Sequence, residues 1–171
     1  MSRPDLNRVP VFYHNYIKLV DSDDLITAMK EQGASFREFL DSITHTKTDH
    51  RYAEGKWSIK EILQHCIDAE RIFAYRSLCI ARKDQTAFPG FEEEAYAKNA
   101  KTENRTWESL KEEFTVVRKS SVILFETFDE EQLEASGIAS GHSNYVRAFG
   151  FIMVGHLRHH QNIIIERYLN N

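Results

Sequence analysis

The sequence predicts an all-α protein, a four-helix bundle in which the helices run up-down-down-up. Apolar residues recur with a period near 3.6 along most of the 171 residues, and no convincing run of strict alternation marks a strand. About 24 residues, 82–105, separate the second and third helices. A connection of that length is typical of a crossover between parallel helices, and a simple up-down-up-down bundle is the alternative.

Length and composition limit what else the chain can be. We expect one domain over residues 1–171, with residues 1–20 as an N-terminal lead-in packed on the bundle. The apolar side chains of this lead-in are Val11, Phe12, Tyr13, Tyr16 and Ile17. A net charge of −4 disfavours nucleic acid or an anionic membrane as a partner. The longest apolar stretch, 148–155, is about a third of a membrane span, so we expect a cytoplasmic protein.

The first two helices have clear start signals. The first follows the cap-forming residues 21–24. Its buried stripe is Leu25, Met29, Gln32, Phe36, Phe39, Leu40 and Ile43. The second begins at the capping box Ser58–Glu61 and should run to about Ala81, with Trp57 and Ile62 in the positions of a hydrophobic staple. Its inward residues are Ile62, Leu63, Cys66, Ile67, Phe73, Ala74 and Leu78. The capping role accounts for Glu61, which is otherwise a candidate general base.

The third helix should start near Thr106 and the fourth after residues 141–144, with a single capped turn at Asp129–Gln132 between them. The apolar face of the third helix carries Leu110, Phe114, Val117, Ser121, Leu124, Phe125 and Phe128. That of the fourth carries Phe149, Ile152, Met153, Ile163, Ile164 and Tyr168. The two cysteines, Cys66 and Cys79, lie roughly 20 Å apart on the second helix, so we interpret both as reduced core residues.

Three of the eight histidines interrupt apolar stripes that face the core. His156 and His160 are four residues apart on the last helix, so both imidazoles project from one face. His159, three residues after His156, could take the place of His160. His65 interrupts the corresponding stripe of the second helix.

The expected topology brings these histidines to a similar depth in the bundle. Helices two and four are antiparallel, so the start of one lies beside the end of the other. His65 is roughly 10 Å into its helix, and His156 and His160 are roughly 12–18 Å from the end of theirs. We therefore expect a set of three nitrogen ligands. The alternative is three core histidines that hydrogen bond to backbone or water.

Three neutral imidazoles leave the charge of a divalent ion uncompensated and at least one coordination position open, which is typical of a catalytic site. That position would hold a water of lowered pKa, a thiolate or a carboxylate. Imidazole suits Zn, Ni, Cu or Fe, and we expect zinc or nickel.

Other polar residues have less specific interpretations. Asp68 could orient an imidazole or act as a base, but its simpler role is a surface partner of Arg71. Trp107 is interpreted as a core residue. The histidines expected on the surface or in loops are His14, His45, His50 and His142. The arginines expected to be solvated are Arg147, Arg158 and Arg167.

Two blocks of sequence resemble the DinB-like superfamily, close to its DinB_2 and YfiT-like branches. They are GKWSIKEILQHCIDAERIFAYRSLCIARKDQTAFPGFEEEAYAKNA at 55–100 and VRAFGFIMVGHLRHHQNIIIERYL at 146–169. The resemblance implies an up-down-down-up bundle and a divalent metal held by His65, His156 and His160, which favours His160 over His159.

The resemblance is less specific about activity. Members are described as metal-dependent hydrolases, and related proteins are S-transferases that use low-molecular-weight thiols such as bacillithiol or mycothiol. We therefore expect first a metal-dependent enzyme that activates such a thiol for transfer to an electrophilic small molecule. The alternatives are hydrolysis by metal-bound hydroxide and a non-enzymatic, stress-related metal- or ligand-binding module. A homodimer is expected in each case.

Overall fold

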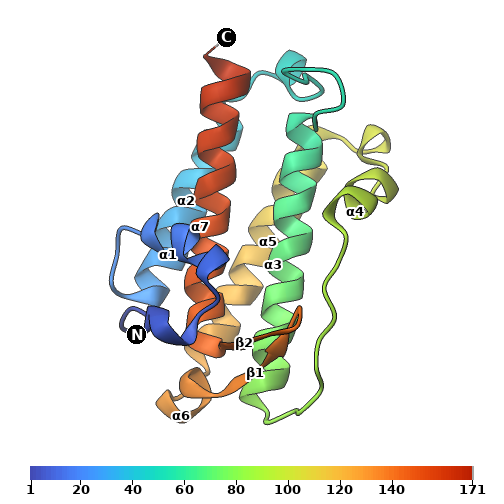
Figure 1. Ribbon diagram of the computed structural model, residues 1–171. Coiled ribbons are helices and arrows are strands. Elements are labelled where there is room, and N and C mark those ends of the chain that lie inside the picture. Colours follow the sequence, from blue (N-terminus) through green and yellow to red (C-terminus); the bar gives the residue numbers. More distant parts are fainter. Residues whose placement is uncertain (171) are drawn as a thin grey trace.

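The computed structural model describes residues 1–170 and has the predicted up-down-down-up topology (Figure 1). Helices α2 (Leu25–Ser42) and α7 (Val146–Ile164) run in one direction, and α3 (Ile59–Ala81) and α5 (Trp107–Glu126) run in the other. Both α2 and α3 pack against α5 and α7. Antiparallel and parallel neighbours therefore alternate around the bundle.

The helix starts follow the capping residues identified from the sequence. At the start of α2, Asp24 accepts a hydrogen bond of 2.9 Å from the backbone N–H of Thr27. Ser58 and Glu61 form both hydrogen bonds of the capping box at the start of α3. At the start of α5, the Thr106 hydroxyl accepts a hydrogen bond of 3.1 Å from the backbone N–H of Ser109. Local side-chain chemistry thus sets where three of the four long helices begin.

The crossover between α3 and α5 runs along the outside of α3 (Figure 1). It contains the short helix α4 (Glu93–Asn99) and a 3₁₀ turn at Thr102–Asn104. Near its start, the N–H of Phe88 donates to the Ile138 carbonyl at 2.9 Å, and the N–H of Ser140 donates to the Phe88 carbonyl at 2.9 Å. These two bonds tie the crossover to the segment that precedes α7.

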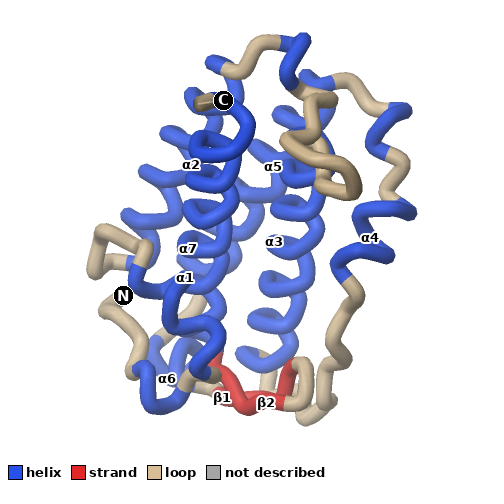
Figure 2. The backbone as a smooth tube through the Cα atoms, turned by 45° about the horizontal axis from the view of Figure 1, so that its top comes forward, coloured by secondary structure: helices blue, strands red, loops and turns tan. Residues whose placement is uncertain are grey.

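That segment contains a β-hairpin that the sequence analysis missed (Figure 2). The capped turn expected after α5 is present as α6 (Glu130–Glu134), with Asp129 in a capping box. Strands β1 (Ser136–Ala139) and β2 (His142–Tyr145) follow and pair antiparallel. His142, expected in a loop, is therefore an exposed strand residue. Both residues of the connecting turn have positive φ, 53° and 78°, as a type I′ hairpin turn requires.

The core agrees with most of the predicted stripes and differs at particular positions. Leu78 is exposed instead of buried, because the buried face of α3 passes through Ser77 and Ile80 toward the hairpin. Val11 and Phe12 are also exposed, at 79% and 53%, on a 3₁₀ turn between the buried residues Val9 and Ile17. The stripe residues that are only partly buried are Phe39, Ala74, Leu124 and Ile163.

Arg147 was expected to be solvated and is instead buried at the start of α7. Its guanidinium pairs with Glu130 and Glu134 of α6, so the burial of its charge is compensated. Cys66 is buried and Cys79 partly buried, and both thiols are free. Within residues 1–170, no helix has both the length and the apolar character needed to cross a membrane.

Helix α1 (His14–Lys18) lies directly against α7 because Gly155 has no side chain. A Cβ atom at Gly155 would overlap the backbone carbonyl of Tyr16. The ring of Tyr16 in turn packs on His156, with 5.4 Å between centroids. The absence of a methyl group on α7 therefore allows the lead-in to cover this part of the bundle.

We expect Gly155→Ala to lower the free energy of unfolding by about 1–3 kcal/mol, measured by urea denaturation. The substitution gains about 1 kcal/mol of helix propensity, but the obstructing atoms are backbone and can move only with α1. Gly150→Ala on the same helix is the control. There the added Cβ meets side-chain atoms of Leu25 and Phe125, which can rotate, so the loss should be smaller. Equal losses would contradict this explanation.

Candidate metal centre

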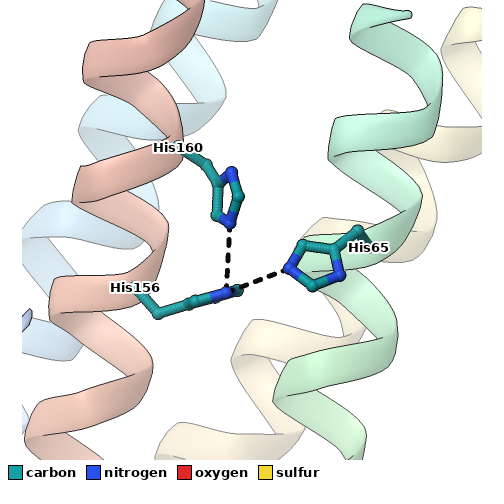
Figure 3. Close-up of side chains that lie close together, drawn as sticks. All are labelled: His65, His156 and His160. Carbon is teal, nitrogen blue, oxygen red and sulfur yellow. Dashed lines mark hydrogen bonds between the residues drawn. The ribbon is translucent and has the colours of Figure 1, made fainter. Parts of the chain in front are cut away.

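Three histidines from two helices converge between α3 and α7 (Figure 3). The Nε2 atom of His65 lies 3.1 Å from that of His156, and the Nε2 atom of His160 lies 3.1 Å from the same atom. Each residue offers one ligand atom, and these three atoms all lie within 4.8 Å of one another. The three histidines therefore lie at a similar depth along the bundle, as expected from their distances to the helix ends.

The spacing of the nitrogen atoms fits a shared metal ion. An ion about 2.1 Å from each imidazole nitrogen would separate neighbouring nitrogens by about 3.0–3.4 Å, depending on the coordination angle. The two observed separations of 3.1 Å fall within this range. The third pair, His65 and His160, lies within 4.8 Å, so the two separations at His156 are the ones that match a shared ion.

Burial keeps all three imidazoles neutral at neutral pH. It lowers the pKa of His65 to about 4. The pKa values of His156 and His160 also lie well below the ordinary value, through burial first and then through the neighbouring imidazoles. Neutral imidazole is the form that coordinates a metal, so the site is prepared for binding without loss of a proton.

Aromatic rings hold the histidine rings in place. Trp57 lies 4.9 Å from His65, and Phe73 lies 6.2 Å from His156, both measured between ring centroids. His159 is partly buried and packs on Tyr16 at 5.3 Å and on the ring of His160 at 5.2 Å, but it does not belong to the group of converging nitrogens. Of the two alternatives that spacing alone left open, the structure brings His160 to the other two histidines.

Two cavities give small molecules access to this group. One of about 340 Å³ reaches His156 and is bounded by α1, α3, α4 and the hairpin turn. Its aromatic lining consists of Phe12, Tyr13, Tyr16, Phe73 and Phe91, and its polar lining includes Arg76, Glu93 and Ser140. A second cavity of about 180 Å³ reaches His160 from the C-terminal end of α7, beside Trp57 and Tyr168.

Comparison with known proteins identifies the family. The sequence profile described as the DinB superfamily matches residues 28–164. The chain belongs to the DinB superfamily. Among solved structures, YfiT from Bacillus subtilis matches with a TM-score of 0.74 at 16% sequence identity, over 83% of this chain and 82% of that chain. At this identity the match shows a shared fold. The comparison with curated protein sequences gave no significant match.

YfiT is described as "a probable metal-dependent hydrolase with an unusual four-helix bundle topology". In this DinB-superfamily chain, α2 packs parallel to α7, and α3 packs parallel to α5. Parallel neighbours need a long connection, which the crossover supplies between α3 and α5.

Among the residues that the structure describes, Asp68 does not contact the histidine group, and the positive charge of Arg71 acts on its carboxyl group without a direct ion pair. It accepts a hydrogen bond of 2.9 Å from Gln64, and Arg71 pairs with Glu113 on α5. In the part of the chain that the structure describes, Asp68 does not belong to the histidine group.

The sequence analysis did not identify the polar residues of the larger cavity in this DinB-superfamily protein. Arg76 lies on the same helix as His65, and Glu93 and Ser140 lie on the crossover and the hairpin turn. Their proximity depends on how two connections fold back on the bundle, which helical periodicity does not describe. The run of three glutamates at 92–94 in the crossover was a sign of a polar segment there, but not of its position.

Proposed function

We propose that this protein is a metal-dependent enzyme in which His65, His156 and His160 hold a divalent transition metal, zinc or nickel. The observation that carries the proposal is the 3.1 Å spacing of buried, neutral Nε2 atoms. Three protein ligands leave a coordination position open, which is the pattern of catalytic zinc sites. When bound, the ion would supply Lewis acidity and lower the pKa of a water or a thiol.

Hydrolysis is the reaction that we place first. It needs only water as co-substrate, and both cavities connect the histidine group with the surface. The structural neighbour is also described as a metal-dependent hydrolase. S-transfer from a low-molecular-weight thiol is the second candidate, because a divalent ion with three neutral ligands favours an anionic co-substrate such as a thiolate.

One assay distinguishes these reactions. The protein is loaded with zinc or nickel, its metal content is measured, and turnover of an activated ester and of a chloronitrobenzene is followed with and without added thiol. Thiol-independent ester hydrolysis supports the first candidate, and thiol-dependent loss of the chloronitrobenzene supports the second. Full metal occupancy with neither activity would favour a binding module and contradict the proposal.

Glu93 is the acidic residue of the cavity beside His156, and it is our candidate for proton exchange in this reaction. It lines the same cavity as His156, and burial together with Glu92 and Glu94 raises its pKa. A raised pKa brings a carboxyl group closer to the range useful for general acid–base catalysis. The aromatic lining of the cavity would keep bulk water from the reacting group.

We therefore expect Glu93→Gln to lower kcat by about 100-fold without changing the metal content. Glu103→Gln is the matched control, since Glu103 lies on the same crossover at an exposed position outside the cavity. It should leave kcat within about a factor of two. Steady-state kinetics of both variants, with metal analysis, tests this role. An unchanged kcat in Glu93→Gln would exclude Glu93 as the proton acceptor.

A further inference from the structure

The cavity beside His156 contains a buried guanidinium that lacks a carboxylate partner. Three arginines are buried in this chain, and Arg118 and Arg147 each pair with glutamates. Arg76, which is 3% exposed, donates instead only to neutral oxygens, the Pro89 carbonyl at 2.6 Å, Ser140 Oγ at 3.3 Å and the Tyr13 hydroxyl. Within residues 1–170, it has no ion-pair partner.

A buried cation without a counter-ion is unfavourable, because neutral oxygen atoms replace only part of its hydration. Burial accordingly lowers the pKa of Arg76, and the nearby Tyr13 hydroxyl opposes this effect only in part. Such a group is retained at a cavity wall when an anion completes its environment. Arginine is especially suited to carboxylate, because two N–H groups can bind its two oxygen atoms.

The turn of the hairpin that contacts this guanidinium has a strained backbone. Ser140 has a φ of 53°, in the left-handed region that residues other than glycine seldom adopt. That conformation lets the turn bring Ser140 Oγ to Arg76. Strained residues of this kind are often found at ligand-binding sites.

The cavity connects Arg76 with the candidate metal centre. The ring of Phe73 is near both, with its centroid 5.9 Å from the guanidinium carbon of Arg76 and 6.2 Å from the centroid of the His156 ring. The remaining walls are mainly aromatic, and the volume is about 340 Å³. This lining favours a small, flat, apolar molecule that carries one charged end.

We infer that Arg76 binds the carboxylate of the substrate, and that the substrate is a small aromatic or apolar carboxylate whose reactive group points toward His156. Glu93 also lines the cavity, but its side chain is only partly buried and solvent screens its charge, whereas Arg76 is 3% exposed. An anion is therefore directed to the Arg76 end. The orientation toward His156 rests on the proposed function, but the carboxylate site requires no metal.

Titration with phenylacetate and phenylacetamide tests the inference. These probes have the same size and differ in charge, and calorimetry or ligand-observed NMR measures their affinity. We expect phenylacetate to bind about 10- to 100-fold more tightly, as a charged hydrogen-bond pair predicts. Arg76→Gln should abolish the difference. Arg82→Gln, an exposed position just after the same helix, should preserve it.

The comparison of acid and amide on the unchanged chain does not depend on the folding of any variant. Equal affinities, no binding of either probe, or a preference that survives Arg76→Gln would overturn the inference. The titration is repeated on metal-free and metal-loaded protein. A preference for phenylacetate in a chain that takes up no metal would support the carboxylate site and overturn the proposed metal enzyme. Failure of the carboxylate site is thus distinguishable from failure of the proposed function.

Discussion

Replacing His156 by alanine is expected to remove most of the metal affinity and, with it, the activity. Its Nε2 atom lies 3.1 Å from the Nε2 atoms of both other histidines, so it is the central donor of the group. Structural zinc sites gain about 10–16 kcal/mol from four ligands, so one ligand accounts for about 3–4 kcal/mol. Metal affinity should therefore fall by about two to three orders of magnitude, with kcat/KM at limiting metal falling at least as far.

The matched control for His156→Ala is His159→Ala. His159 is on the same helix and touches Tyr16, as His156 does, but it is outside the group of converging nitrogens. Metal content after dialysis should be near one ion per chain in His159→Ala and near zero in His156→Ala. Circular dichroism would establish that both variants remain helical. If the control loses the metal and His156→Ala keeps it, the ligand assignment is wrong.

The four long helices and their direction could be predicted because the determining information is local. The capping box at Ser58–Glu61 places the start of α3 at Ile59 irrespective of the rest of the fold. The length of the crossover favours a parallel arrangement of α3 and α5 over a simple antiparallel connection. The histidine trio was predictable for the same reason, since two helix faces and one direction are enough to bring His65 beside His156.

The remaining features depend on contacts that no periodicity encodes. Each hairpin strand has four residues, too few for an alternating pattern to stand out from the helical background. Arg147 looks like a surface residue until α6 folds back and supplies Glu130 and Glu134. The wall of the larger cavity is assembled in the same way, because Arg76 becomes part of it only when the hairpin turn reaches α3.

The metal-free protein is expected to lose stability steeply as the pH falls below about 6.5. In the folded chain burial lowers the pKa of His65 to about 4 and those of His156 and His160 well below the ordinary value of 6.5. Between these values the unfolded chain binds protons that the folded chain does not, so acid favours unfolding. Above pH 6.5 both states are neutral at these positions and the effect vanishes.

The expected size of this effect is several kcal/mol. Protonation of His65 alone should lower the free energy of unfolding by about 3 kcal/mol between pH 7 and pH 4, since its pKa falls from 6.5 to about 4 on folding. With all three sites titrating, the slope approaches about 4 kcal/mol per pH unit. Urea denaturation of metal-free protein at intervals from pH 7.5 to 4.5 measures the slope, above the range in which most carboxylates titrate.

Substitution separates the histidine contribution from other titrating groups. In His65→Gln the slope of stability against pH should fall by about 1.4 kcal/mol per pH unit. The reason is that residue 65 no longer binds a proton in the unfolded chain that it cannot bind in the folded chain. His45→Gln, at an exposed position outside the bundle core, should leave the slope unchanged.

Metal-loaded protein should be more stable than the metal-free form at pH 7.5, and the difference should shrink in acid because protons compete with the ion for the same nitrogens. A metal-free protein equally stable at pH 6.5 and 5 would mean that these imidazoles are not held neutral in the folded state, which would contradict the burial on which the candidate metal centre depends.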